Sequence, residues 1–143
     1  MAAMKRSLAV EIFWKIHPIV YRLTGGRLLG ELMGMPVLLL TTRGRKTGQL
    51  RTTPLTYLPG QDSYVVIGSF LGAPRHPGWV HNLRADPRAR LQVGSRRIEA
   101  LAREAEGEER ARLWKAAADL GAGYEEYEEQ TECVIPVVVL EPA

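Results

Sequence analysis

Between Pro36 and Leu140 the chain contains six short runs rich in apolar and β-branched residues, and turn-forming residues bound each run. Runs of about four to eight such residues between Gly, Pro, Asp and Asn clusters are typical of β-strands. Few helical segments interrupt the series, so the pattern predicts a mainly β domain with flanking helices, an α+β chain built on a small barrel. The expected strands cover residues 37–42, 50–58, 64–69, 90–93, 97–102 and 134–140.

Helical periodicity is expected over residues 7–23, where apolar residues recur at spacings of three and four. Pro18 lies inside this range and predicts a bend or an interruption. A short helix is expected over residues 79–83. A longer helix over residues 108–120 begins with acidic residues, as the helix dipole favours. The apolar face expected for the longer helix consists of Ala111, Trp114, Ala117 and Ala118.

The change of pattern at Pro36 divides the chain into two parts. Residues 1–35 form a helical segment that is expected to pack on or over the barrel, and residues 36–143 form the barrel domain itself. Cations such as Lys15 and Arg22 accompany the apolar stripe of the first part. A basic amphipathic helix is also typical of peripheral membrane contact, so packing on the core and lying on a membrane both remain open.

Composition indicates the class of protein and its expected location in the cell. The 143 residues suit one domain, and a hydrophobic content of 45% with 24% charged residues is typical of a globular protein. Cys133 is the single cysteine, which excludes an intramolecular disulfide and favours a reducing compartment. No secretory signal or bilayer-spanning run is recognisable, so the expected location is the cytoplasm, with membrane association left open.

The stretch TTRGRKTGQLRTTP, residues 41–54, carries four cations around two glycines. It is not a nucleotide P-loop, because Arg45 precedes Lys46 where glycine is required, and a strand rather than a helix is expected to follow. A strand–turn–strand with exposed backbone N–H groups can instead form an anion nest, to which Arg45, Lys46 and the Thr47 hydroxyl add donors. A solvated basic hairpin tip is the alternative.

Other kinds of site receive little support from the sequence. His76 and His81 have no Cys, Asp or Glu at ligand spacing beside them, so no metal site is expected. No serine nucleophile elbow is present, and Cys133 has no obvious base. Interleaved exposed aromatics are missing and the aromatic content is 7%, so nucleic acid is not an expected partner, although a basic barrel leaves it as a weak alternative.

Several segments together resemble one known family. The segments TTRGRKTGQLRTTPLTYL, GAPRHPGWVHNLRADPRARLQV, GEERARLW and YEEYEEQTECVIPVVVLEP, in this order and spacing, are similar to the deazaflavin-dependent nitroreductase family of actinobacterial F420H2-dependent reductases. The resemblance covers most of residues 36–142. It implies a split β-barrel of the FMN-binding, flavin-reductase type. It also implies the cofactor F420, whose phospholactate and oligoglutamate tail would supply the anion for the basic stretch.

The resemblance also assigns candidate site residues. The phosphate and tail would contact Arg45, Lys46, Thr47 and Arg51, and the deazaflavin ring would lie in a groove lined by Tyr57, Ser69, Gly78 and Trp79. Tyr124 and Tyr127, with Ser69, would be the catalytic residues that donate a proton or a hydrogen bond to the reduced acceptor. Core packing of Trp79 and simple packing of the two tyrosines against the barrel are the alternatives.

The implied activity is hydride transfer from reduced F420 to a conjugated, electron-poor and mostly apolar acceptor. The acceptor classes are quinones, α,β-unsaturated lactones of the coumarin type such as aflatoxins, and nitroaromatics. Gly121-Ala122 stands where many relatives have a tyrosine and a proline, which favours an acceptor bulkier than a nitroimidazole. An F420-reducing dehydrogenase would be an indirect partner through the cofactor pool. The alternatives are an FMN-dependent reductase on the same barrel and a non-catalytic deazaflavin carrier.

Overall fold

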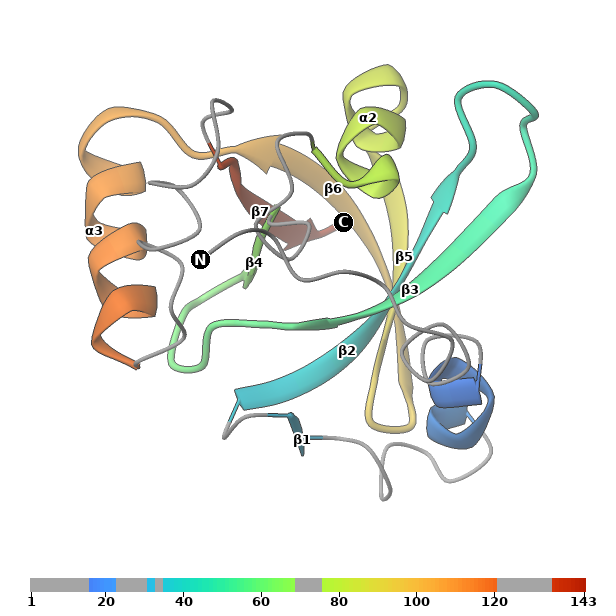
Figure 1. Ribbon diagram of the computed structural model, residues 1–143, viewed down its shortest axis with the longest axis horizontal. Coiled ribbons are helices and arrows are strands. Elements are labelled where there is room, and N and C mark those ends of the chain that lie inside the picture. The colour runs from blue at the N-terminus through green and yellow to red at the C-terminus, as the bar shows by residue number, and fades with distance from the viewer. Residues whose placement is uncertain (1–15, 23–30, 33–34, 69–75, 121–134) are drawn as a thin grey trace, which may run out of the picture.

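The computed structural model describes residues 16–22, 31–32, 35–68, 76–120 and 135–143, which form a curled, mainly antiparallel sheet with helices at its edges (Figure 1). Among these residues the sheet has seven strands: six follow the order β1-β2-β5-β6-β7-β4, and β3 pairs with β2 off this path. This architecture confirms the predicted α+β, split-barrel fold class. The strands are β1 (Glu31–Leu32), β2 (Met35–Arg43), β3 (Leu50–Thr56), β4 (Tyr64–Ile67), β5 (Arg88–Val93), β6 (Arg96–Glu104) and β7 (Val137–Pro142).

The two ends of the curled sheet approach each other between β3 and β4. The Leu58 N–H, just after β3, donates to the Val65 carbonyl in β4 at 2.9 Å. Beside this bond the rings of Tyr57 and Tyr64 pack edge to face, with centroids 5.4 Å apart. An aromatic pair in this geometry contributes about 0.5–1.5 kcal/mol beyond its area burial. This backbone bond and this ring contact therefore both contribute to closing the barrel on this side.

Two large apolar clusters and a small one fill the described part of the fold. The larger one lies inside the curl of the sheet, where Leu38 and Leu40 of β2 meet Val66, Leu91 and Leu140 from other strands. The second lies between the sheet and the helix α3 (Gly107–Asp119). Alternate residues of β2 point to opposite faces, so Val37 and Leu39 instead pack against Tyr21 on the outer side.

The helices α2 and α3 lie where the sequence predicts them, but their ends and their buried residues differ from the prediction. The helix α2 (Gly78–Ala85) is longer at both ends than the predicted span. In α3 the buried residues are Leu113 and Ala117. The predicted apolar face was therefore wrong at Ala111, which is exposed, and it omitted Leu113. The buried pair lies four residues apart, one helical turn, whereas Ala111 points away from the sheet.

Residues 16–22 are helical and continue through Pro18, so the predicted interruption does not occur within them. Tyr21 joins this helix to the sheet, because its buried hydroxyl donates to the Val37 carbonyl at 2.9 Å and accepts the Gly94 N–H at 2.7 Å. Arg22 also donates to Thr52 Oγ1 on β3 at 2.8 Å. In the part of the chain that the structure describes, no helix has the length and apolar character needed to cross a membrane.

Candidate functional site

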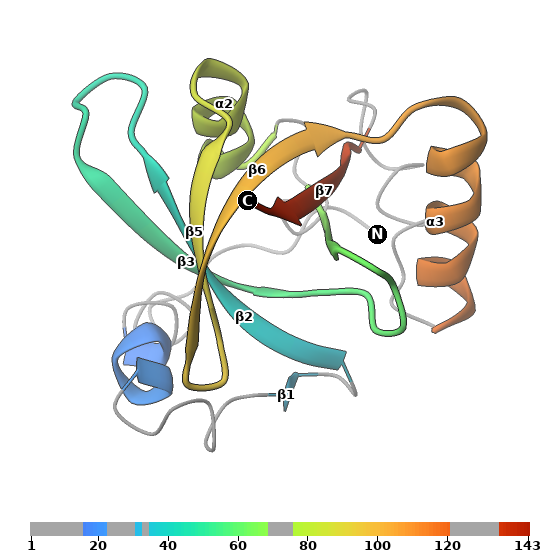
Figure 2. The ribbon, with the colours of Figure 1, turned by 180° about the vertical axis from the view of Figure 1, so that it is seen from behind.

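The basic turn, residues 44–49, joins β2 to β3 and extends beyond the rest of the sheet next to α2 (Figures 1 and 2). Hydrogen bonds fold it on itself. The Gly44 N–H donates to the Gln49 carbonyl at 2.7 Å, and the Gly48 N–H donates to the Gly44 carbonyl at 2.8 Å. Gly48 has a φ of 73°, in the left-handed region that glycine adopts without strain. The Gln49 N–H donates to Thr47 Oγ1 at 3.2 Å.

The nest of backbone donors in this turn is smaller than the sequence predicts. The N–H groups of Gly44, Gly48 and Gln49 already have acceptors within the turn, and the Arg45 N–H donates to Asn82 Oδ1 of α2 at 3.1 Å. The side chains of Arg45 and Lys46 are exposed. An anion at this turn would therefore be bound mainly by charged side chains, together with the hydroxyl hydrogen of Thr47.

The register of the β2–β3 hairpin sorts its residues onto two faces. Arg51 lies opposite Thr42, and Leu55 lies opposite Leu38. Cross-strand partners point to the same side, and Thr42 and Leu38 are buried on the side that faces α2. The odd-numbered residues of β3 therefore share this inner face. In order from the basic turn toward the core they are Arg51, Thr53, Leu55 and, just after the strand, Tyr57.

This inner face changes character along its length. Arg51 is exposed at the turn end, Thr53 is half-buried in the middle, and Tyr57 packs against the larger core cluster at the far end. Six residues of extended chain span about 20 Å. One strand face thus presents a cation, a hydroxyl and an aromatic ring in a line, which suits an elongated ligand with an anionic end and a flat end.

Burial acts on the aromatic end of this face. It raises the pKa of the Tyr57 phenol, and the neighbouring Tyr64 and Tyr21 raise it further, while Arg96 lowers it. Tyr57 therefore keeps its proton at neutral pH. Trp79, in the first turn of α2, is 7% exposed and belongs to the larger core cluster, so packing is the role that its contacts show. Gly78 is exposed, and a Cβ added there would have no atom within 4 Å.

Gly68 brings the end of β4 against α2. Its N–H donates to the Pro136 carbonyl at 2.8 Å. A Cβ at this position would lie 2.6 Å from Pro136 Cγ and 2.9 Å from Val80 Cγ2. Both distances are shorter than carbon atoms tolerate without movement. The missing side chain lets β4, α2 and the segment before β7 approach closely beside Trp79, and Gly68 is followed directly in the chain by Ser69.

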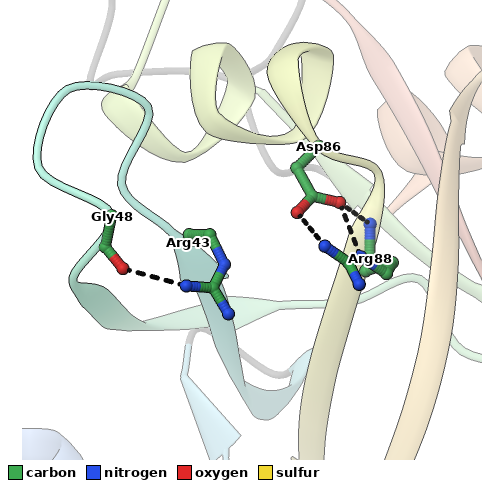
Figure 3. Close-up of polar contacts among 4 residues, drawn as sticks. All are labelled: Arg43, Gly48, Asp86 and Arg88. Carbon is green, nitrogen blue, oxygen red and sulfur yellow. Dashed lines mark hydrogen bonds and ion pairs between the residues drawn. The ribbon is translucent and has the colours of Figure 1, made fainter.

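The charge balance near the turn favours an anion. Arg43 donates from Nη1 to the Gly48 carbonyl at 3.2 Å, which places its guanidinium across the base of the turn (Figure 3). Asp86, at the end of α2, is held by Arg88 through both carboxylate oxygens. Hydrogen bonds from Arg88, with a smaller contribution from Arg43, lower the pKa of Asp86 to about 2. The negative charge of Asp86 is therefore compensated by Arg88 and opposes an anion at the turn only weakly.

The two histidines of the α2 region pack against each other, with ring centroids 5.8 Å apart. Burial lowers the pKa of His76, and the charges of Arg84 and His81 lower it further. His76 is therefore neutral at pH 7. Among the described residues there is no group of three or more His, Cys, Asp or Glu side chains that could hold a metal ion.

Three of the predicted site residues, Ser69, Tyr124 and Tyr127, lie outside the described residues. The other predicted residues lie along the β2–β3 hairpin and at the start of α2: Arg45, Lys46 and Thr47 in the turn, Arg51 and Tyr57 at opposite ends of the inner face, and Gly78 and Trp79 on α2.

Sequence reasoning missed Thr53, Gly68 and Asn82. The two-residue period of a strand places Thr53 between Arg51 and Tyr57 and was sufficient to find it. No local signal indicates Gly68 or Asn82, because the partners of both come from distant parts of the chain.

A family model described as F420H(2)-dependent quinone reductase matches residues 13–142, nearly the whole chain. The chain belongs to this family. Membership in this F420H(2)-dependent quinone reductase family confirms the resemblance to F420H2-dependent reductases, the assignment as an F420-dependent reductase and the expected cofactor F420. Among curated relatives, an F420H(2)-dependent quinone reductase of Mycobacterium tuberculosis is 40% identical over 141 residues, which cover 96% of this chain and 94% of the relative.

Solved structures agree with the family. A structure described as an F420-H2 dependent reductase is 38% identical, with a TM-score of 0.67, and the match covers 74% of this chain and 94% of that one. A second structure, described as a domain-swapped dimer, is 32% identical with a TM-score of 0.70, and the match covers 94% of this chain and all of that one. The split-barrel fold of this F420H(2)-dependent quinone reductase family member is thus shared by its solved relatives.

Proposed function

We propose that this chain transfers a hydride from reduced F420 to a quinone-class acceptor, and that the cofactor lies along the inner face of β3 between Arg51 and Tyr57. The observation that carries this proposal is the single strand face with a cation at one end and an aromatic residue at the other. When bound, the deazaflavin supplies a hydride from its C5 carbon. The quinone acceptor is supported by the name of the family and of the M. tuberculosis relative.

The residues of the basic turn fit the anionic part of this cofactor. Arg45 and Lys46 at the tip, with Arg51 on the inner face, would bind the phosphate and the glutamate carboxylates, and Thr47 would donate from its hydroxyl. Each charge-assisted hydrogen bond contributes about 1.5–3 kcal/mol. Three such contacts suffice to anchor a multiply charged tail, and they exceed what the one phosphate of FMN requires.

The residues at the other end fit a flat ring. Tyr57 offers a half-buried aromatic side chain, and Gly78 leaves open space at the start of α2. Trp79 follows Gly78 in α2 and belongs to the larger core cluster, and we propose that it also supports the ring. We assign proton or hydrogen-bond donation to the acceptor to Tyr124, Tyr127 and Ser69, on the family resemblance of their positions.

Further acceptors follow from the same chemistry. Unsaturated lactones of the coumarin type, including aflatoxins, and nitroaromatics are electron-poor at a carbon or nitrogen that accepts a hydride, and we propose them as slower substrates. The reduced cofactor would come from an F420-reducing dehydrogenase through a shared pool.

The test is a fluorescence titration of the purified protein with oxidised F420 and, in parallel, with FMN. We expect F420 to bind and FMN to bind much more weakly. Lys46→Ala combined with Arg51→Ala should weaken F420 binding at least about tenfold, with little change in Tm. Arg97→Ala combined with Lys115→Ala removes two exposed cations from β6 and α3, and it should leave the affinity within about twofold.

Three results would contradict parts of this proposal. Preference for FMN would overturn the cofactor assignment. Equal effects of the two double variants would remove the tail-binding role from the basic turn. If the protein binds F420 but does not oxidise F420H2 with simple quinones such as menadione, the quinone-class acceptor is overturned.

A further inference from the structure

Asn82 occupies a position in α2 that an apolar residue would be expected to fill. Its neighbours Val80 and Leu83 are buried in the larger core cluster, and Asn82 itself is 7% exposed. A buried amide is costly unless its polar atoms have partners. Asn82 therefore requires an explanation in terms of what its side chain binds.

Both polar atoms of the Asn82 side chain contact the β2–β3 hairpin. Oδ1 accepts the Arg45 N–H at 3.1 Å, and Nδ2 donates to Thr42 Oγ1 at 3.1 Å. The backbone N–H of Arg45 can only donate, so it requires the oxygen of the amide on its side. The nitrogen then faces the Thr42 hydroxyl, which is buried at the end of β2. The amide thus joins Thr42, near the end of β2, to Arg45 in the basic turn.

This bridge fixes the orientation of the basic turn relative to α2. The other hydrogen bonds of the turn lie within the hairpin, between Arg43 and Gln49, and they shape the turn without joining it to another element. Among the described residues, the bond to Asn82 is the one hydrogen bond from residues 44–48 that leaves the hairpin. A hairpin that extends beyond the sheet otherwise bends freely about its base.

The same helix also carries the ring end of the site. Trp79 and Asn82 are three residues apart in α2, so they lie on one side of the helix. α2 therefore contacts the inner part of the barrel through Trp79 and the basic turn through Asn82.

We propose that Asn82 is a positioning residue, which holds the basic turn at the place where Arg45, Lys46 and Arg51 meet the anionic tail of the cofactor. This inference rests on the proposed function. Through Asn82, one helix sets the separation between the tail-binding and ring-binding ends. Loss of the amide would leave every cation in place and would still weaken tail binding, because the cations would no longer be held together.

The first experiment uses the protein without cofactor. Trypsin cleaves after Arg45 and Lys46 only when the turn opens enough to enter the protease. Asn82→Ala should increase the rate of cleavage in the turn about tenfold, measured by mass spectrometry of early fragments. Thr42→Val, which removes one of the two bonds, should give a smaller increase, and Thr42→Ser, which keeps the hydroxyl, should restore the slow rate. Val139→Ala, a cavity variant in the cluster beside α3, is the control for general loss of stability.

The second experiment compares two ligands by fluorescence titration: F420, and the tail-less deazaflavin that lacks the phospholactate and the glutamates. Asn82→Ala should raise the Kd for F420 about tenfold and leave the Kd for the tail-less compound unchanged. Val139→Ala should leave both unchanged. If Asn82→Ala does not fold, Thr42→Val provides the same comparison with a smaller shift.

The outcomes separate this inference from the proposed function. If the unchanged protein binds F420 and Arg51→Ala weakens that binding, but Asn82→Ala and Thr42→Val leave both cleavage and F420 affinity unaltered, the positioning role is overturned and the proposed function stands. Equal losses for both ligands would also overturn it, because they indicate a general packing defect. If the unchanged protein does not bind F420, the proposed function itself fails, and the protease experiment alone still decides whether Asn82 holds the turn.

Discussion

Gly68 and Gly78 flank the segment that joins β4 to α2, and the space around them differs. The position of a Cβ on Gly68 is filled by Pro136 and Val80, whereas that on Gly78 is open. A close approach of backbone to a neighbouring proline ring cannot be relieved by a rotamer change, because the ring is rigid. The two glycines therefore have different roles, one in packing and the other beside the proposed ring site.

Alanine substitutions distinguish these roles. Gly68→Ala should lower the free energy of unfolding by about 1–3 kcal/mol, because the added methyl overpacks the junction. Gly78→Ala should leave it unchanged or raise it by up to about 1 kcal/mol, since alanine is the better helix former. Gly78→Ala should nevertheless weaken F420 binding, as its methyl enters the open space. Urea denaturation and F420 titration measure the two effects, and a Gly68→Ala protein as stable as the parent would contradict the first.

At the scale of single residues, the sequence was sufficient to propose those site residues that lie together in one short stretch. Arg45, Lys46 and Arg51 were found because their spacing around glycines is visible in one short stretch. Asn82 was not predicted, because its role depends on hydrogen bonds to Thr42 and Arg45, which are distant from it in the sequence.

At the scale of elements, α3 is fastened to the sheet by ion pairs as well as by its apolar face. Arg103 on β6 contacts Glu109 in the first turn of α3 and Glu141 on β7. The hydrogen bonds from Arg103 lower the pKa of Glu109. A carboxylate with a lowered pKa adds stability above its ordinary pKa, and this contribution is lost as pH falls through the lowered value.

Arg103→Gln should therefore lower the Tm at pH 7 by about 2 °C, a small effect because the pairs are exposed to solvent. The difference from the parent should shrink as pH falls below about 4, where Glu109 becomes protonated in the unfolded chain and then in the folded one. Thermal denaturation at pH 7 and pH 3 measures it, with Arg97→Gln as the control that changes neither Tm. A difference that is equal at both pH values would show that Glu109 is not involved.

The elements themselves were largely predictable, and their errors have physical causes. Five of the six strands before residue 105, β2 to β6, were predicted because apolar alternation and glycine turns mark them, although β5 begins two residues earlier than predicted, at Arg88. The two-residue strand β1 was missed. The last strand begins at Val137, three residues later than predicted, because Ile135 and Pro136 precede it as buried chain outside the strand. Apolar composition alone does not distinguish a strand from a buried segment that leads into it.

For the whole molecule, one buried hydroxyl joins three segments. Tyr21 in the first helix donates to Val37 at the start of β2 and accepts from Gly94 in the turn between β5 and β6. Burial raises the pKa of this phenol, so it stays protonated at neutral pH. The hydroxyl therefore connects the helical segment to two parts of the sheet that are distant in sequence.

Tyr21→Phe should lower the free energy of unfolding by about 1–3 kcal/mol, because it leaves the buried Val37 carbonyl and the half-buried Gly94 N–H without the hydroxyl. The measurement is the urea midpoint at constant m value. Tyr64→Phe is the matched control, since it removes a half-buried hydroxyl and keeps the ring contact with Tyr57, and its midpoint should be close to that of the parent. Equal midpoints for Tyr21→Phe and the parent would contradict the joining role.

The order of strands in the sheet could not be predicted from local pattern. β5 pairs with β2, and β7 lies between β6 and β4. These pairings depend on which apolar faces meet when the sheet curls, and the six runs of the sequence are too similar in character to reveal it. The pattern of residues predicted a small barrel and the strand–turn–strand of residues 37–58, and the resemblance to a known family added the split-barrel type.

The β2–β3 hairpin has a consequence for the order in which the molecule assembles. Its strands pair residues of one short stretch, from Arg43 with Leu50 to Val37 with Thr56, whereas β4 pairs with β7 across the second half of the chain. Hairpins form in about 1–10 μs, and distant pairings are slower because a long loop must close first. A refolding chain therefore forms the β2–β3 hairpin, a cationic arm that carries the basic turn, before the barrel closes. Polyanions in the refolding medium would meet that arm while the rest of the molecule is still unfolded.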